Sequence, residues 1–246
     1  MTIFATISSL WNSICWLILL AIAGLLAAGF VRGPYLSERE GRMAKEFELP
    51  QSALLIGLAL ILWLAALRDS ALSTAGLWLL AGVAFGFLGD LCMANVFQRA
   101  NHVLHGIGAF GTGHLFYLLA FREVALRFGL HDLTAYAVAL VVTWAIAIGA
   151  WLAFVRKPGG DSLQYAALGY ALLLGGVAAY ALGMGLQRSA FLPTGIGTLL
   201  FMGSDLLLAA RLFSGKRFRY IGDLIWLSYI VAQALIVTLG LTALAA

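Results

Sequence analysis

The sequence is short of charge, cysteine and proline, and the first shortage already narrows the class of protein. Of its 246 residues, 11% are charged and 63% are hydrophobic, and the mean hydropathy is +0.98. A soluble domain has about 25% charged and about 45–50% apolar residues. The composition therefore predicts an integral membrane protein that crosses the bilayer with helices. Its richness in Ala, Gly and Leu suggests a bacterial inner membrane.

The two cysteines, Cys15 and Cys92, both fall in apolar segments. They provide neither a disulfide framework nor a CxxC metal signature. The formal net charge of +4 is small and lies in loops, which fits the topology of a membrane protein better than binding to nucleic acid. We therefore expect no nucleic-acid partner, and we expect neither a metal nor another cofactor.

Eight apolar runs are each long enough to cross a bilayer, which takes about 20 residues. The prediction is one compact all-α bundle of about eight transmembrane helices, with a first helix and charged loop at 1–50 and a main region at 51–246. The first run lacks a preceding basic region, so we interpret it as a retained span. Because no proline falls in the middle of a run, we expect no proline-broken helix. The runs cover about 10–31, 51–67, 72–97, 103–121, 133–155, 163–185, 191–213 and 222–244.

Lysine and arginine are distributed unevenly between the connections. The odd-numbered loops and the helix ends beside them carry Arg32, Arg39, Arg42, Lys45, Arg99, Arg156, Lys157, Arg211, Lys216, Arg217 and Arg219, whereas the even-numbered ones carry Arg68, Arg122, Arg127 and Arg188. Because cytoplasmic loops are enriched in these residues, the odd-numbered loops are predicted to be cytoplasmic and both termini to lie on the opposite side. The long connection at 32–50 is interpreted as a solvated loop.

Two aspartates, Asp90 and Asp205, stand inside apolar runs with the same local pattern of a tiny residue before and a leucine after. A carboxylate at bilayer depth costs roughly 2.5–3.5 kcal/mol, so such a residue marks a functional site by default. The runs at 72–97 and 191–213 should cross in the same direction. Both carboxyl groups are then predicted to lie roughly 10–12 Å from the cytoplasmic helix end and to face each other.

Further polar residues share helix faces in the predicted spans. His114 and Tyr117 are three apart, and Tyr229 and Gln233 are four apart. A single such residue is usually satisfied by one interhelical hydrogen bond, but four of them beside two aspartates predict a polar cavity. The glycines at 106, 108, 111 and 113 are interpreted as allowing close helix packing.

Histidines also occur where the run at 103–121 begins. We expect His102 and His105, together with Arg99, to lie at the interface near a phospholipid head group. Zinc is disfavoured because His105 and His114 lie about 13 Å apart along a straight helix, and because the histidine spacing fits no structural zinc pattern.

Four segments appear in an order and spacing that resemble the YhhN-like lysoplasmalogenase family, a group of multi-span enzymes that hydrolyse the vinyl ether bond of lysoplasmalogens. They are GDLCMANVF, HGIGAFGTGHLFYLLAF, GTLLFMGSDLLLAARLF and SYIVAQALI. The likeness covers roughly residues 50–245. It implies that Asp90 and Asp205 are the catalytic acids, and that their pocket is lined by His114, Tyr117, Ser204, Tyr229 and Gln233. The sequence departs from the family pattern at Leu49-Pro50, where relatives often have Lys-Pro, and at Met93, where they tend to have leucine.

The chemistry expected from the resemblance is slow protonation of a vinyl ether carbon, followed by addition of water and release of a fatty aldehyde. Two carboxyl groups in a medium of low dielectric do not both ionise easily, so one would donate the proton and the other would stabilise the cation. The sequence does not assign the two roles. The expected partners are a lysophospholipid substrate and membrane lipids, with the oligomeric state open. A proton-coupled transporter that uses the same acids, a zinc-dependent lipid hydrolase and a purely structural lipid-binding protein remain the alternatives.

Overall fold

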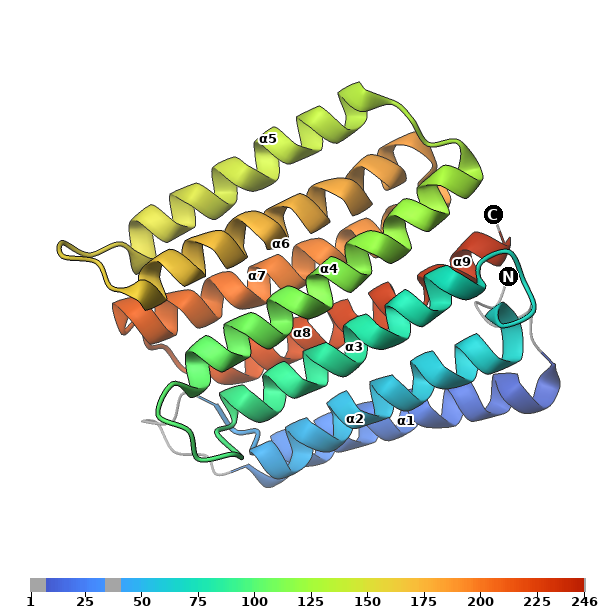
Figure 1. The fold of residues 1–246 in the computed structure, drawn as a ribbon. Coiled ribbons are helices and arrows are strands. Elements are labelled where there is room, and N and C mark those ends of the chain that lie inside the picture. The colour runs from blue at the N-terminus through green and yellow to red at the C-terminus, as the bar shows by residue number, and fades with distance from the viewer. Residues whose placement is uncertain (1–7, 34–40, 246) are drawn as a thin grey trace.

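The computed structural model describes residues 8–33 and 41–245, and the part of the 32–50 connection at residues 34–40 lies outside them. Over the described residues the chain is helical, without a β-strand, and the helices run back and forth side by side (Figure 1). Seven helices are long and apolar enough to cross a membrane, and the bent pair α8–α9 qualifies as an eighth span in this part of the chain. The predicted all-α membrane bundle is confirmed.

The helices of the bundle have the following bounds, with two short π-helical ends and one 3₁₀ turn. They are α1 Ser9–Arg32, α2 Lys45–Leu62 with its continuation Trp63–Leu67, α3 Ser73–Met93, α4 His102–Phe128, α5 Leu133–Ala150 with its continuation Trp151–Val155, α6 Ser162–Gln187, the 3₁₀ turn Ser189–Phe191, α7 Leu192–Ser214, α8 Ile221–Val237 and α9 Leu239–Ala245. Consecutive helices from α1 to α4 and from α5 to α8 pack as antiparallel pairs, whereas α4 packs on α6 and not on α5, and α1 and α5 lie at opposite edges.

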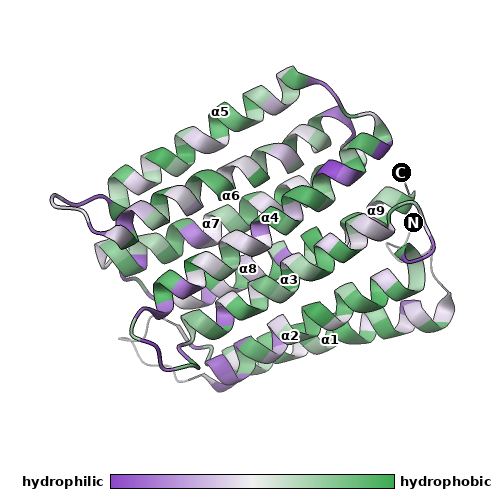
Figure 2. Ribbon diagram, viewed as in Figure 1, coloured by the Kyte–Doolittle hydropathy of each residue, from purple (hydrophilic) through white to green (hydrophobic). Residues whose placement is uncertain are grey.

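Hydrophilic residues gather at the two ends of the bundle, while apolar residues run along the helices between them (Figure 2). We call the end that holds the α3–α4, α5–α6 and α7–α8 connections the basic end. Ten of the basic residues assigned above to odd-numbered connections lie there, and Arg39 is outside the described residues. The start of α1 and the end of α9 lie at the other end (Figure 1). Which side of the membrane each end faces stays a prediction.

The second helix begins earlier than the apolar run predicted. It starts at Lys45, so Pro50 lies inside α2 and not at its start. Glu46 and Glu48 occupy the first turn, where the positive end of the helix dipole favours acidic side chains. The predicted solvated loop therefore ends at Ala44, and its last six residues form helix.

Helix α3 ends earlier than predicted, at Met93 and not near residue 97. Asn95 and Gln98 adopt left-handed backbone angles of φ 51° and 50°, which end the helix in a turn. The Asn95 side chain accepts a hydrogen bond from the Arg99 amide at 2.9 Å within this turn. Asp90 is then about 4 Å along the axis from its helix end and Asp205 about 13 Å from the end of α7, so the matched distances to the helix ends are wrong.

Two other spans differ from the sequence prediction. Helix α4 continues to Phe128, seven residues past the apolar run, and ends at Gly129, whose positive φ of 64° is typical of a helix C-terminus. The last run is broken at Thr238, where α8 and α9 meet at 40°. The Thr238 hydroxyl donates to the carbonyls of Ala234 and Leu235, and such back-bonding bends helices.

Candidate active site

A polar cavity of about 490 Å³ lies between α2, α3, α4, α7 and α8 and extends to the basic end of the bundle. Both aspartates singled out by the sequence line it. Its charged and polar lining residues are Lys45, Glu48, Asp90, His102, Ser204, Asp205, Arg211, Trp226 and Tyr229. Both acids therefore line one interior space, and whether they face each other closely enough to share a proton stays a prediction.

Asp90, on α3, is buried with 7% of its surface exposed. Its Oδ2 atom accepts a hydrogen bond from the Ser52 hydroxyl of α2 and one from the Tyr229 hydroxyl of α8, the latter at 2.8 Å. The carboxyl group thus ties three helices together through a single oxygen. Both donors are themselves buried, so this contact is shielded from water.

The Tyr229 hydroxyl is held in its donating role by a chain of buried groups. It accepts a hydrogen bond from Gln233 Nε2 at 3.1 Å, and Gln233 Oε1 in turn accepts one from the Tyr117 hydroxyl. Because Gln233 already donates to the Tyr229 oxygen, the single tyrosine hydrogen is left to point at Asp90. We call Tyr117, Gln233, Tyr229, Ser52 and Asp90 the Asp90 arm.

Glycines on α3 make room for the Asp90 arm. A Cβ atom added at Gly86 would lie 2.7 Å from Gln233 Nε2, and one at Gly82 would lie 2.3 Å from the Tyr117 ring. Neither position accepts a side chain unless the arm moves. On the neighbouring α4, Gly106 and Gly113 also face close contacts, whereas Gly108 has nothing within 4 Å of an added Cβ and Gly111 has contacts at 3.8 Å.

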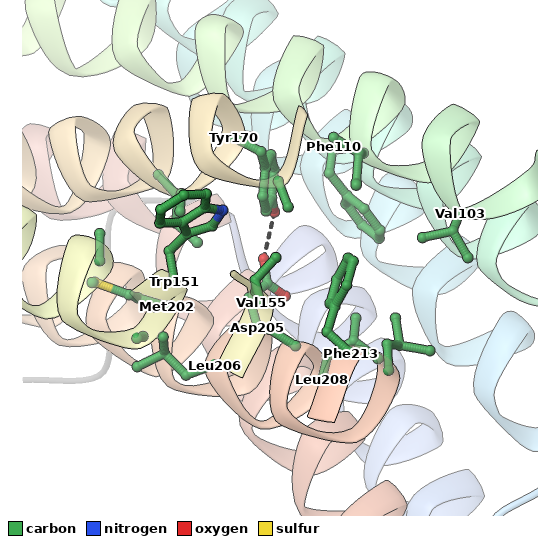
Figure 3. Close-up of a pocket in the computed structure, with 18 of the residues that line it drawn as sticks. Val103, Phe110, Trp151, Val155, Tyr170, Met202, Asp205, Leu206, Leu208 and Phe213 are labelled. Atoms are coloured by element: carbon green, nitrogen blue, oxygen red, sulfur yellow. Dashed lines mark hydrogen bonds between the residues drawn. The ribbon is translucent and has the colours of Figure 1, made fainter. Parts of the chain in front are cut away.

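Asp205, on α7, has a different environment. It is only partly buried, and its Oδ2 accepts a hydrogen bond from the Tyr170 hydroxyl of α6 (Figure 3). The same hydroxyl lies 3.3 Å from His114 Nε2, and the two rings stack with centroids 5.6 Å apart. His114 is buried, and its Nδ1 has no hydrogen-bond partner among the described residues. We call His114, Tyr170 and Asp205 the Asp205 arm.

The Asp205 arm is compatible with two directions of hydrogen bonding. Tyr170 carries one hydroxyl hydrogen, so it either donates to Asp205 while His114 donates to it, or donates to His114 while a protonated Asp205 donates to it. In both arrangements Asp205 Oδ2, the Tyr170 hydroxyl and His114 Nε2 each have a hydrogen-bond partner. Asp205 can therefore gain and lose a proton while it keeps its hydrogen bond to Tyr170, provided that the His114 proton moves between Nε2 and Nδ1, whereas the Asp90 arm is held in one direction.

Asp205 also lies where two cavities meet. A second pocket, between α4, α6, α7 and the end of α5, is lined by apolar side chains except for Tyr170 and Asp205 (Figure 3). Five residues line both spaces: Met93, Phe110, Asp205, Leu208 and Leu212. Asp90 lines the polar cavity but not the apolar pocket. Within the described residues no hydrogen bond joins the two carboxyl groups, and each has its own tyrosine.

The other predicted site residues divide into two groups. Ser204 lines the cavity, although its hydroxyl donates to the Ile225 carbonyl at 2.9 Å and not to an aspartate. Arg99 and His105 are exposed, and neither belongs to the cavity lining, which includes His102 and Arg211 instead. The head-group role predicted for Arg99 and His105 stays a prediction.

Sequence reasoning missed Ser52 and left Tyr170 outside the site. A signal for Ser52 exists, because Lys45, Glu48 and Ser52 are spaced three and four apart and lie on one face of a helix that begins at Lys45. All three side chains contribute to the cavity or to the Asp90 contact. If the helix is assumed to begin after Pro50, Lys45 and Glu48 fall outside it and the shared face is not recognised.

A short segment before α2, residues 41–44, covers one side of the cavity mouth. The Asp223 carboxylate on α8 accepts hydrogen bonds from the Arg42 and Met43 amides at 2.8–2.9 Å. The Arg42 guanidinium donates to the carbonyls of Val31 and Gly33 and lies 4.6 Å from the centre of the Phe30 ring. We call this segment the strap. It connects the end of α1 with the start of α8.

These observations define a multi-pass helical membrane protein in which one buried and one partly buried acid line the same cavity. The chain matches the YhhN family over residues 51–240 and belongs to that family. No match was found among proteins of curated function or among solved structures. In the part of the chain that the structure describes, no three His, Cys, Asp or Glu side chains cluster as metal ligands would.

Proposed function

We propose that the protein is a lysoplasmalogenase, a membrane-embedded hydrolase that cleaves the vinyl ether bond of lysoplasmalogens to a fatty aldehyde and a glycerophospho-head group. The observation that carries the proposal is the position of Asp205 at the junction of a polar cavity and an apolar pocket. A lysolipid has the same division, with a charged head group, an apolar chain and the reactive bond between them. As part of the proposal, the basic end faces the cytoplasm of a bacterial inner membrane.

The substrate fits the two spaces in one orientation. The alkenyl chain enters the apolar pocket beside Phe110 and Tyr170, and the glycerophosphate lies in the polar cavity. The vinyl ether then lies next to Asp205. Its second alkene carbon points towards the apolar pocket, and its oxygen points towards Asp90. Asp205 is thus nearest to the alkene carbon that must be protonated, and Asp90 is nearest to the carbon that becomes cationic.

In the proposed reaction, Asp205 is the general acid and transfers its proton to the second carbon of the alkenyl chain. The resulting oxocarbenium ion is stabilised by the Asp90 carboxylate, which Ser52 and Tyr229 keep as a hydrogen-bond acceptor. Water adds to the first carbon as Asp90 takes one of its protons. The hemiacetal then collapses: its hydroxyl proton returns to Asp205, Asp90 protonates the departing glycerol oxygen, and both acids are restored.

The His114–Tyr170 pair supports this cycle because Asp205 must exist in both protonation states. When Asp205 is protonated, it donates to Tyr170, and when it is charged, it accepts from Tyr170. The pair therefore acts as a positioning element that adjusts to each state. Tyr117 and Gln233 have the corresponding role for Asp90, through Tyr229.

The test is incubation of the purified protein with lysoplasmenyl-ethanolamine in heavy water, with mass spectrometry of the trapped product. Protonation at carbon predicts a free aldehyde that carries one deuterium on its second carbon. Asp205→Asn and Asp90→Asn should each abolish aldehyde release, and Asp69→Asn, which changes an exposed acid beside Arg68, serves as the matched control. Full activity in either cavity variant contradicts the proposal, and substrate flux into liposomes without aldehyde favours a transporter.

A further inference from the structure

The mouth of the polar cavity carries side chains of both signs that the reaction itself does not use. Lys45, Glu48, His102 and Arg211 line it, from α2, α4 and α7. Glu48 is half-buried and interacts electrostatically with Asp223 and, with opposite sign, with Arg211. We propose that this mouth is the head-group subsite and that Glu48 binds the ammonium of an ethanolamine head group, so that the protein selects ethanolamine over choline lysolipids. This rests on the proposed function, because the head group belongs to that substrate.

The depth of these residues matches the length of a lysolipid. Glu48 lies four residues before Ser52 on α2, about 6 Å nearer the basic end, and Arg211 lies six residues after Asp205 on α7, about 9 Å nearer the same end. The ether oxygen of a glycerophospholipid is separated from phosphorus by five bonds, roughly 6 Å when extended. At this length the phosphate lies near the level of Glu48 and about 3 Å short of the Cα level of Arg211, so the long Arg211 side chain must extend back towards it while the vinyl ether lies beside the two aspartates.

The two cations and the one acid suit a zwitterion. Arginine and lysine are the usual partners of a phosphate, and arginine contacts it through two parallel N–H donors. A carboxylate such as Glu48 accepts hydrogen bonds from the three N–H groups of a primary ammonium. A quaternary ammonium has no N–H to offer, so the same carboxylate discriminates between the two head groups.

The aromatic lining of the cavity does not provide the alternative that choline needs. Quaternary ammonium groups are bound by cages of aromatic faces. The rings that line this cavity pack against one another: Trp226 and Tyr229 have centroids 5.3 Å apart, and Phe110 meets Tyr229 edge-on at 6.0 Å. The Trp226 indole also donates to Gln51 Oε1 at 3.1 Å.

Two of the four mouth residues, Lys45 and Glu48, precede the region that matches the family, which begins at residue 51. They are placed by the early start of α2 and by the strap, whose Gly41 and Met43 line the same mouth. Lys45 lies one helical turn before Leu49, which also lines the cavity and stands where the family resemblance expects a lysine. The selectivity is therefore a property of this chain's own α2.

The experiment compares kcat/KM for lysoplasmenyl-ethanolamine and lysoplasmenyl-choline in the wild type, in Glu48→Gln and in the matched control Glu46→Gln. Glu46 lies on the same first turn of α2 but is exposed and does not line the cavity. We expect the ethanolamine-to-choline ratio to fall about tenfold in Glu48→Gln and to keep its wild-type value in Glu46→Gln. A ratio within twofold of wild type in Glu48→Gln overturns the subsite.

A binding measurement separates this inference from the proposed function. Saturated-ether lysophosphoethanolamine and lysophosphocholine cannot undergo the reaction, and their affinities are measurable on any variant that purifies as a folded protein. Tighter ethanolamine binding that Glu48→Gln removes supports the subsite even if no aldehyde is ever released. Equal affinities for the two head groups in the wild type overturn it, even if the protein proves to be a lysoplasmalogenase. If Glu48→Gln fails to fold, Glu48→Ala takes its place, and an unchanged preference in that variant also counts against the subsite.

Discussion

The Asp90 arm and the Asp205 arm hold the same type of side chain in opposite ways. Asp90 is buried and accepts two hydroxyl donors, one of which is fixed in direction by Gln233. Asp205 is partly exposed to two cavities and has one tyrosine partner, which can reverse its direction towards His114. A group held only as an acceptor suits a permanent carboxylate, and a group with a reversible partner suits a proton donor. The difference between the arms is the basis of the proposed roles, which the two similar sequence patterns leave open.

The largest expected effect comes from removing either carboxylate. Asp205→Asn takes away the proposed general acid, and such groups contribute about 10²–10⁴-fold to rate, so we expect a loss in kcat at the upper end of that range. Asp90→Asn removes the anion proposed to stabilise the cation, and we expect a loss of about 10²–10³-fold. Steady-state aldehyde release at saturating substrate measures both. Equal activity of Asp205→Asn and wild type contradicts the assignment of the acid.

A double-mutant cycle sharpens the comparison between the arms. Tyr229→Phe and Gln233→Leu act on the same carboxylate, so their effects on kcat should be strongly non-additive. Tyr229→Phe and Tyr170→Phe act on different arms, and their effects should add within about 0.5 kcal/mol. The measurement is kcat for the three single and the two double variants under one set of conditions. Strong coupling between the two tyrosines would mean that the arms form one network.

The glycines of α3 test whether the Asp90 arm is as tightly packed as its contacts indicate. Gly86→Ala places a methyl group 2.7 Å from Gln233 Nε2, and overpacking of this kind costs about 1–3 kcal/mol. Gly57→Ala on α2 is the control, because an added Cβ there meets nothing within 4 Å and alanine favours helix by up to about 1 kcal/mol. Thermal unfolding in detergent measures both. A neutral Gly86→Ala would show that the arm can move aside.

The smallest expected effect concerns the strap, which lies farther from either carboxylate. Asp223→Ala removes the acceptor of the Arg42 and Met43 amides, at a cost of about 1–3 kcal/mol for unpaired buried donors. We expect faster hydrogen exchange at residues 41–44 with little change in global unfolding. Asp69→Ala, which breaks only the exposed pair with Arg68, is the control and should change neither. Unaltered exchange in Asp223→Ala would show that the strap is held by other contacts.

Hydrophobic length predicted the bundle from sequence, and the two intramembrane aspartates predicted the site, because each is a strong local signal with few alternatives. Helix ends were the weak point. Pro50 suggested a start that the acidic first turn moves back to Lys45, and Asn95 ends α3 before its apolar run does. Partners such as Ser52 and Tyr170 were hidden for a related reason: each is ordinary in its own segment and becomes informative only when helices from distant parts of the chain meet.

Arg42 links α1 to the entrance of the cavity, since it binds the last carbonyls of that helix while its own amide is held by α8. The first helix, which packs mainly on α2 and precedes the family match, thereby helps to hold the strap in place at the cavity mouth. A chain that begins after α1 should still release aldehyde but lose its preference between head groups. It should act on ethanolamine and choline lysolipids at more similar rates. The region that matches the family would then carry out the reaction, and α1 would influence which lipids reach it.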